Sequence, residues 1–391
     1  TAPAPGTAPG VAPAAGGSAL PDPRLAEALL ARPAAWFAAE QPCLVAAVTH
    51  CADNGMPRLA RELAAVVIAS SAALYNQFDA WSRTHTVALA AVRRSGDTEG
   101  EARLLHGLGR LRLEQDRFDD AYAYFQDALR LFEQTGAVRD RADALAGMGT
   151  VRREQGRFAE ALNLLHAAVT GYREPADTAA LADLHYGIGA VHRDRGAYPE
   201  SHRALTRALE LYRAVADRQG EALTLRSLAL HHRAKGELTE AERLLREALR
   251  VFDETGDTFG EMYASQSLAK VRLRQGCVAE ARERLERCLD VTRERRDLFG
   301  EALVLRSLGE TRLAAGDWDG ATDELRQALA LWEGMELPLW RARTLRDLGT
   351  AAAGRGDPAA AHAAWAEAQD VFRTLGSREA AEEPPGGAPT P

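Results

Sequence analysis

Basic side chains that recur at intervals of forty residues are the part of this sequence best suited to bind a ligand. They fall in two columns of the sequence, with two further residues nearby, and are Arg153, Arg193, Arg226, Arg233, Lys270, Arg274, Arg306 and Arg346. Guanidinium groups donate paired hydrogen bonds to carboxylates. We therefore predict that these residues line a concave groove and bind a protein or peptide that carries carboxylates. The alternative is a solvated basic face that Glu154, Asp194 and Glu310 neutralise.

Histidine and cysteine do not form a metal-binding pattern. Cys43, His50 and Cys51 come closest to a ligand cluster, but a structural zinc site almost always has four ligands. His231 and His232 are adjacent, so on a helix their side chains point about 100° apart. We predict no metal site, and we interpret the first cluster as a buried thiol and a surface imidazole on one helix.

Motifs of nucleotide binding and of nucleophilic catalysis are absent from the sequence. GxxxxGK[ST] does not occur, so we do not expect ATP or GTP to bind through a phosphate loop. GxSxG is absent as well, and no Ser-His-Asp or Cys-His arrangement stands out. We predict that the chain is not an enzyme and uses no cofactor.

The candidate binding residues are carried by an internal repeat of forty residues. One column of the repeat contains turn residues: Asp116, Gly156, Gly196, Gly236, Gly276, Gly316 and Gly356. A second column contains small residues: Gly109, Gly149, Gly189, Ala229, Ala269, Gly309 and Gly349. A third column, mostly aromatic, contains Phe132, Tyr172, Tyr212, Phe252, Thr292, Trp332 and Phe372. A fixed period of this length indicates stacked copies of one supersecondary unit, and the third column should lie in the core between copies.

Within one unit the apolar spacing is that of two helices joined by a short turn. Leu105 and Leu108 share one helical face before the turn, and Phe125 lies on the apolar face of the helix after it. Small residues in the second column would let the two helix backbones approach closely. Thr98 and Glu101 have the spacing of a capping box for the first helix.

A family resemblance rests on the same positions. They read Leu105-x2-Leu108-Gly109, followed by Ala121-x3-Phe125 and Ala128. This pattern resembles the tetratricopeptide consensus over about residues 98–377. The resemblance implies an all-α fold, a right-handed superhelix (α-solenoid) of about seven to eight helix-turn-helix repeats with an irregular helical N-terminal cap. The period exceeds the usual ~34 residues of that family, as in a long-repeat subclass found in bacterial signalling ATPases.

Composition and register divide the chain into five segments. Residues 1–20 are almost entirely Ala, Pro and Gly, and we predict a disordered linker there. We predict a helical cap over 21–56, a degenerate repeat over 57–96 and seven full repeats over 97–377. Residues 378–391 are again rich in Pro, Gly and acidic residues, and we predict a disordered tail.

A second resemblance concerns the region before the full repeats. Trp36-Phe37-x2-Glu40, with Trp81-x3-His85 further along, looks like the beginning of the repeat tail of large actinobacterial regulators of the AfsR type. Those proteins combine a DNA-binding head, an NB-ARC nucleotide switch and tetratricopeptide repeats. The resemblance, with Thr rather than Met at position 1, leads us to expect DNA-binding and nucleotide-binding domains upstream of this chain.

Charge and hydropathy exclude some classes of protein. The formal net charge is −8, from 48 basic and 56 acidic residues, which argues against direct nucleic-acid binding. We recognise no signal peptide and no transmembrane segment. The four cysteines form no CxxC pair and are typical of reduced thiols, so we predict a cytoplasmic protein.

These observations favour a scaffold that binds a protein or peptide. We predict that it acts as the sensor region of a bacterial signalling or transcriptional regulator. The alternative is a stand-alone receptor for a signalling peptide.

Overall fold

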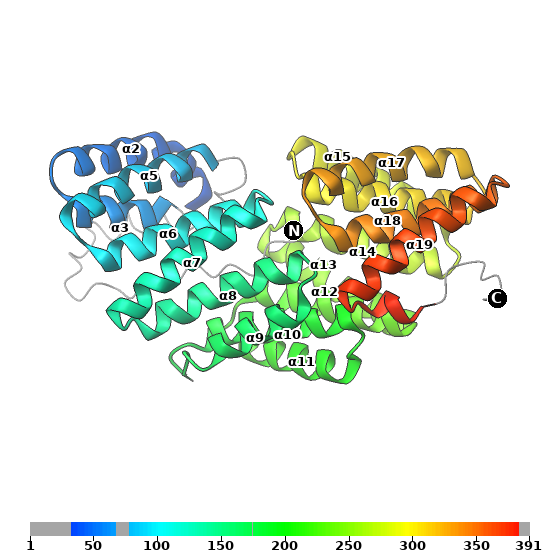
Figure 1. Cartoon of the computed structure of the whole chain (residues 1–391), viewed down its shortest axis with the longest axis horizontal. Helices are drawn as coiled ribbons and strands as arrows, with labels where there is room; N and C mark the ends of the chain where they lie inside the picture. Colours follow the sequence, from blue (N-terminus) through cyan, green and yellow to red (C-terminus); the bar gives the residue numbers. More distant parts are fainter. Residues whose placement is uncertain (1–32, 68–77, 174, 383–391) are drawn as a thin grey trace. The chain divides into compact units, whose positions relative to one another are not determined.

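The computed structural model describes residues 33–67, 78–173 and 175–382. These residues form seventeen α-helices and one short 3-10 helix, and none of them forms a β-strand. The helices follow one another as hairpins along the chain (Figure 1). The predicted all-α repeat fold is confirmed, while the handedness of a superhelix stays a prediction. The predicted linker over 1–20 and the start of the predicted cap lie outside the described residues.

The helix bounds follow the forty-residue register. The helices are α2 (Pro33–Asp53), α3 (Pro57–Val67), α5 (Phe78–Ser95), α6 (Thr98–Glu114), α7 (Phe118–Thr135), α8 (Val138–Glu154), α9 (Phe158–Val169), α10 (Thr178–Arg195), α11 (Tyr198–Ala214), α12 (Arg218–Lys235), α13 (Leu238–Thr255), α14 (Thr258–Arg274), α15 (Val278–Glu294), α16 (Leu298–Ala314), α17 (Trp318–Gly334), α18 (Pro338–Gly354), α19 (Pro358–Leu375) and η1 (Arg378–Ala381).

The turn residues have the backbone conformation that the sequence indicated. All seven residues of the turn column have positive φ angles, from 56° at Asp116 to 86° at Gly276. This left-handed conformation ends a helix and suits glycine, which has no Cβ to clash with the following carbonyl. The turn between successive hairpins has the same geometry, but there Ala216, Arg296 and Glu336 adopt it without being glycine.

Aspartate, and not threonine, caps the first helix of several hairpins. The Asp97 carboxylate accepts a hydrogen bond from the Gly100 N–H at 2.8 Å, and Thr98 is already the first residue of α6. Asp257 caps α14 in the same way through Gly260, also at 2.8 Å. The predicted capping box at Thr98 was therefore placed one residue too late. A carboxylate at this position also interacts favourably with the positive end of the helix dipole.

The two helices of a hairpin approach closely at the column of small residues. A Cβ placed on Gly309 would lie 2.6 Å from Leu325 Cγ, and one on Gly189 would lie 2.6 Å from Leu205 Cγ. The mostly aromatic column packs between hairpins, with Trp332 fully buried. Both columns have the packing roles that the sequence predicted.

The described residues separate into two compact units, and the division falls between Met148 and Gly149, inside α8. In the amino-terminal unit, one hydrophobic core joins α2, α3 and α5 to the first full repeat, and it includes Val48, Trp81 and Phe132. In the carboxyl-terminal unit, the first helices of successive hairpins, α10, α12, α14, α16 and α18, contact one another in order. The predicted segment boundaries themselves stay predictions.

The end of the described chain differs from the predicted disordered tail over 378–391. Residues Arg378–Ala381 form η1, and Glu379 is only 2% exposed. The reason is a buried tertiary contact with α18, which the composition of this segment does not reveal. Residues 383–391 lie outside the described residues.

Candidate functional site

The carboxyl-terminal unit contains a cavity of about 400 Å³ along its inner helices. We call this cavity the groove. It is lined by α10, α12, α14, α16 and α18, by the end of α8, and by the segment that includes η1. All eight residues predicted from the sequence line it: Arg153, Arg193, Arg226, Arg233, Lys270, Arg274, Arg306 and Arg346. The structure thus brings the predicted residues together, while their role in binding stays a prediction.

Four further charged residues line the groove, and the sequence did not point to them. They are Arg343, Arg378, Glu379 and Glu382. Arg343 falls in a mixed column, whose preceding members are Arg103, Asp143, Asp183, Leu223, Tyr263 and Leu303, so no periodic pattern marks it as basic. The other three lie in the segment that composition assigned to a disordered tail.

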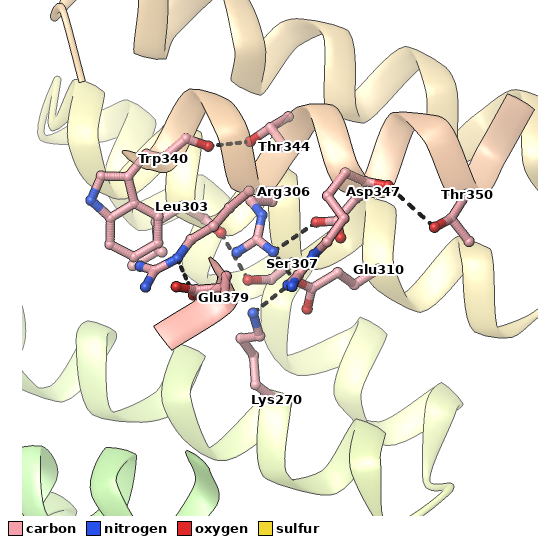
Figure 2. Close-up of polar contacts among 12 residues, drawn as sticks. Lys270, Leu303, Arg306, Ser307, Glu310, Trp340, Thr344, Asp347, Thr350 and Glu379 are labelled. Atoms are coloured by element: carbon pink, nitrogen blue, oxygen red, sulfur yellow. Dashed lines mark hydrogen bonds and ion pairs between the residues drawn. The ribbon is translucent and has the colours of Figure 1, made fainter. Parts of the chain in front are cut away.

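Several of the basic residues form ion pairs between successive inner helices. Arg306 on α16 pairs with Asp347 on α18 at 2.7 Å and with Glu310 at 2.8 Å. Lys270 on α14 also pairs with Glu310, at 2.8 Å. Figure 2 shows these four side chains converging beside Glu379. These pairs link the hairpins that begin with α14, α16 and α18.

The crowding of charges shifts the pKa values of this cluster. Burial would raise the pKa of Glu310, but Lys270 and Arg306 outweigh burial and lower it to about 2. Burial lowers the pKa of Lys270 to about 7, although Glu310 opposes this shift. The Glu310 carboxylate is therefore ionised at neutral pH, whereas the Lys270 ammonium group is near the middle of its titration there, although Glu310 favours its charged form.

At some positions, neighbouring acidic residues neutralise the basic columns, as the alternative interpretation expected. Arg153 pairs with Glu154, and Arg193 pairs with Asp194 at 3.2 Å. Glu310 pairs with Lys270. Each of the three acidic residues Glu154, Asp194 and Glu310 therefore forms an ion pair with a basic residue of the groove.

Three guanidinium groups in the middle of the groove form no ion pair with a carboxylate among the described residues. Arg226 donates to the Tyr263 carbonyl and to Ser267 Oγ, both at 3.2 Å. Arg274 donates to the Arg233 carbonyl at 2.7 Å. Arg233 itself has a buried Nη1 with no hydrogen-bond partner in the described part of the chain, and burial lowers its pKa to about 9.

The groove as a whole has an excess of positive charge. Its lining contains ten basic and five acidic residues, an excess of five positive charges. The chain as a whole carries a net charge of −8. Partly desolvated cations without counter-ions are costly, and an anion that enters the groove relieves that cost.

One end of the groove combines the basic residues with an aromatic wall. The Arg343 guanidinium lies over the Trp340 ring, 4.8 Å from its centroid. Trp340 in turn stacks on Trp332 and contacts Phe299 edge to face. This end of the groove can accept a carboxylate next to an apolar side chain.

The described residues contain neither a metal-binding cluster nor a membrane-spanning helix. Within residues 33–67, 78–173 and 175–382, no group of three His, Cys, Asp or Glu side chains is arranged to hold a metal ion. Cys51 is buried and His50 is exposed on α2, as we interpreted them. No helix in the described part of the chain is long and apolar enough to cross a membrane.

Comparison with known families matches three stretches of this chain to the tetratricopeptide repeat. The matched residues are 100–174, 179–254 and 261–334, more than half of the chain. The chain belongs to the tetratricopeptide repeat family. The forty-residue period is therefore a tetratricopeptide period with longer helices. No curated protein sequence matches the chain.

Solved structures with the same tetratricopeptide fold include three Rap-type proteins. A Rap protein complexed with competence and sporulation factor has a TM-score of 0.61 at 17% identity, over 88% of this chain and 98% of that chain. The Rap conjugation gene regulator of plasmid pLS20, in complex with a Phr peptide, has a TM-score of 0.63 at 14% identity, over 85% and 96%. Aspartyl phosphate phosphatase F from Bacillus subtilis has a TM-score of 0.59 at 14% identity, over 87% and 95%. At such identities the likeness shows the fold alone.

Proposed function

We propose that this tetratricopeptide chain is a stand-alone receptor that captures a carboxylate-bearing peptide in the groove. The observation that carries the proposal is the excess of five positive charges on the groove lining, with Arg226 and Arg233 at its centre forming no ion pair among the described residues. An extended peptide presents side chains and backbone carbonyls to such a lining along its length. Under this proposal the chain is cytoplasmic, and it binds without catalysing a reaction.

The fold comparisons support a peptide as the ligand. Two of the solved structures with this fold are complexes, one with competence and sporulation factor and the other with a Phr peptide. Each of these two structures aligns with most of this chain. Their ligands are therefore bound by the same repeat architecture that forms the groove here. For this reason we favour a peptide over a small anion.

Binding of a ligand can change the arrangement of the hairpins through the ion pairs that link them. A ligand carboxylate that approaches Lys270 or Arg306 competes with Glu310 and Asp347 for the same cations. Because a repeat array has few contacts between distant repeats, small changes between neighbouring hairpins add up along it. A ligand that prefers one arrangement shifts the population towards it.

The test is selection of peptides from a random dodecapeptide phage library on the whole chain. We expect the selected peptides to be enriched in Asp and Glu and to bind more weakly as salt concentration rises. The double variant R226E/R233E should weaken binding of the selected peptides at least about tenfold, since two central attractions become repulsions.

A matched control changes the same charge elsewhere. Arg250 on α13 and Arg326 on α17 are exposed and do not line the groove, so R250E/R326E should leave affinity nearly unchanged. If no acidic peptide is enriched, or if R226E/R233E binds as well as the control, this function is wrong.

A second candidate places the same groove in a larger protein. It rests on the resemblance of the Trp36–Glu40 and Trp81–His85 patterns to AfsR-type regulators, in which the repeats follow a DNA-binding head and an NB-ARC switch. Under this interpretation a ligand in the groove would hold or release the switch. The gene sequence upstream of the codon for Thr1 tests it, because a phosphate-loop domain in frame would favour the regulator over the stand-alone receptor.

A further inference from the structure

The segment that follows α19 lies in the groove. The α19 helix ends at Gly376, which has a left-handed φ of 62°, and η1 follows after Ser377. Glu379 pairs with Arg343 through Nε at 2.7 Å, and Glu382 pairs with Arg346 at 2.6 Å. The segment Arg378–Glu382 thus places two carboxylates, three residues apart, on two basic residues of the groove.

Glu379 is held there as a buried anion. Its side chain is 1% exposed, and that of Arg343 is 6% exposed. Burial alone would raise the pKa of Glu379, but Arg343 and Arg378 outweigh burial, so its pKa lies well below the usual range. Arg343 is fixed on its other sides by the Trp340 ring and by Asp194 at 3.7 Å. The site is therefore built to hold a charged carboxylate.

The internal pair nevertheless leaves hydrogen-bonding capacity unused. Among the described residues, Arg343 Nη2 and Glu379 Oε2 are both buried and have no hydrogen-bond partner. Arg343 thus makes one hydrogen bond to Glu379 where a fork-to-fork pair would make two. Unpartnered buried donors and acceptors are costly, so a carboxylate that is free to align with both nitrogens would bind this arginine better.

We propose that Arg343 and Arg346 form a carboxylate subsite, and that Arg378–Glu382 is its internal ligand. The external ligand is then a peptide with two carboxylates about three residues apart, which must displace this segment in order to bind. The inference rests on the proposed function, because it identifies which part of the groove recognises the peptide and what competes with it.

The internal ligand can be displaced because it is short, although it contacts both α10 and α19. It is a single turn of four residues, joined to α19 at one end and held to that helix by a hydrogen bond from Gln369 to the Ala380 carbonyl at 2.9 Å. A tethered segment of this kind competes at an effective concentration on the order of millimolar. If the segment itself has an intrinsic dissociation constant on the order of 100 µM for the subsite, a free peptide would therefore bind about tenfold more weakly when the segment is in place.

The experiment measures binding of a peptide copy of the segment to the whole chain. The probe is the fluorescein-labelled hexapeptide Ser377–Glu382, and the readout is fluorescence anisotropy. We expect the variant E379Q to bind the probe about tenfold more tightly than the unchanged chain, because its own segment no longer supplies the buried carboxylate. The control E294Q, at an exposed glutamate on α15, should bind like the unchanged chain.

Two further measurements distinguish the competing outcomes. A chain ending at Ser377, which keeps the Gly376 cap, should also bind the probe more tightly, and a probe with E379Q should not bind it. Equal affinity of the unchanged chain and E379Q, or failure of the shortened, still helical chain to bind, would overturn this inference. In that case, library-selected peptides that still bind the unchanged chain would leave the proposed function standing. Absence of any such peptide would instead count against the function.

Discussion

Buried ionisable side chains show at the residue scale how the chain uses charge. In the groove, Glu379 and Arg343 are both buried and both charged, because each stabilises the ionised form of the other. His85 on α5 is the opposite case. It is 2% exposed, its Nδ1 has no hydrogen-bond partner among the described residues, and burial lowers its pKa to about 3. This imidazole therefore remains neutral in the folded chain.

A pH dependence of stability follows from His85. The unfolded chain takes up a proton on this residue below about pH 6.5, whereas the folded chain does not until about pH 3. The contribution of the neutral imidazole to the free energy of unfolding is thus fully present above pH 6.5. This contribution is lost as the pH falls from 6.5 towards 3. The loss is about 1 kcal/mol per pH unit in that window.

Hydrogen exchange of the α5 amides measures this dependence. Between pH 7 and pH 5, protection corrected for intrinsic exchange should fall in the unchanged chain. It should fall less steeply in H85Q, which has no proton to take up at this position, and the remaining decline comes from buried imidazoles such as His106, whose pKa burial lowers to about 4. The exposed His50→Gln serves as the control and should retain the full dependence. An equally steep decline in H85Q would assign the effect to groups other than His85.

At the element scale, the contact between the two helices of a hairpin decides which residues are tolerated. Gly349 on α18 faces α19, and a Cβ there would lie 2.5 Å from the Trp365 ring and 3.1 Å from the Ala361 carbonyl oxygen. The ring cannot easily move, because Trp365 Nε1 donates a hydrogen bond to the Arg346 carbonyl at 3.0 Å. The same column contains alanine at Ala229 and Ala269, so the space available differs between hairpins.

Replacement of Gly349 by alanine should therefore destabilise the chain. We expect a loss of about 1–3 kcal/mol in the free energy of unfolding, since the overpacked helices must separate. The comparison is G334A at the exposed end of α17, where a Cβ would meet nothing within 4 Å. That substitution should be neutral or stabilising by less than about 1 kcal/mol, because alanine is the better helix former. Urea unfolding followed by circular dichroism compares them, and equal midpoints would refute the packing argument.

At the scale of the whole molecule, stability comes from contacts between successive helices. From α2 to α7, and again from α10 to α19, each described helix packs on the next. Isolated helices of 17 or 18 residues, the common length here, are only marginally stable in water. Each hairpin therefore depends on its neighbours to bury its apolar faces.

Deletions of different length test this dependence. Removal of 40 residues, Leu238–Cys277, takes out α13 and α14 and restores the register at the new junction, because Val278 is the equivalent of Leu238. We expect a shorter folded array. Removal of the 20 residues Thr258–Cys277 takes out α14 alone and should expose apolar faces and cause aggregation. Similar thermal melts of the two, by circular dichroism with light scattering, would contradict a nearest-neighbour array.

Much of this fold could be predicted from the sequence because it depends on local, periodic features. The turn at Gly236, the close approach at Gly309 and the buried Trp332 each follow from a residue type that recurs every forty positions. In a repeat array each unit contacts only its neighbours, so a column of the sequence corresponds to a stripe of the structure. For the same reason, basic columns that share a register came together along the groove.

The contacts of the carboxyl-terminal segment were decided only by the tertiary structure. Arg343 lies in a column of mixed charged and apolar residues, and Glu379 lies in a segment whose composition indicated disorder. Arg343 and Glu379 are 36 positions apart, and the approach of Asp194 to Arg343 at 3.7 Å joins residues 149 positions apart. Such contacts depend on small rotations between successive hairpins, summed over several repeats. No single repeat encodes that sum, so the sequence predicted a basic groove but not the acidic segment that lies in it.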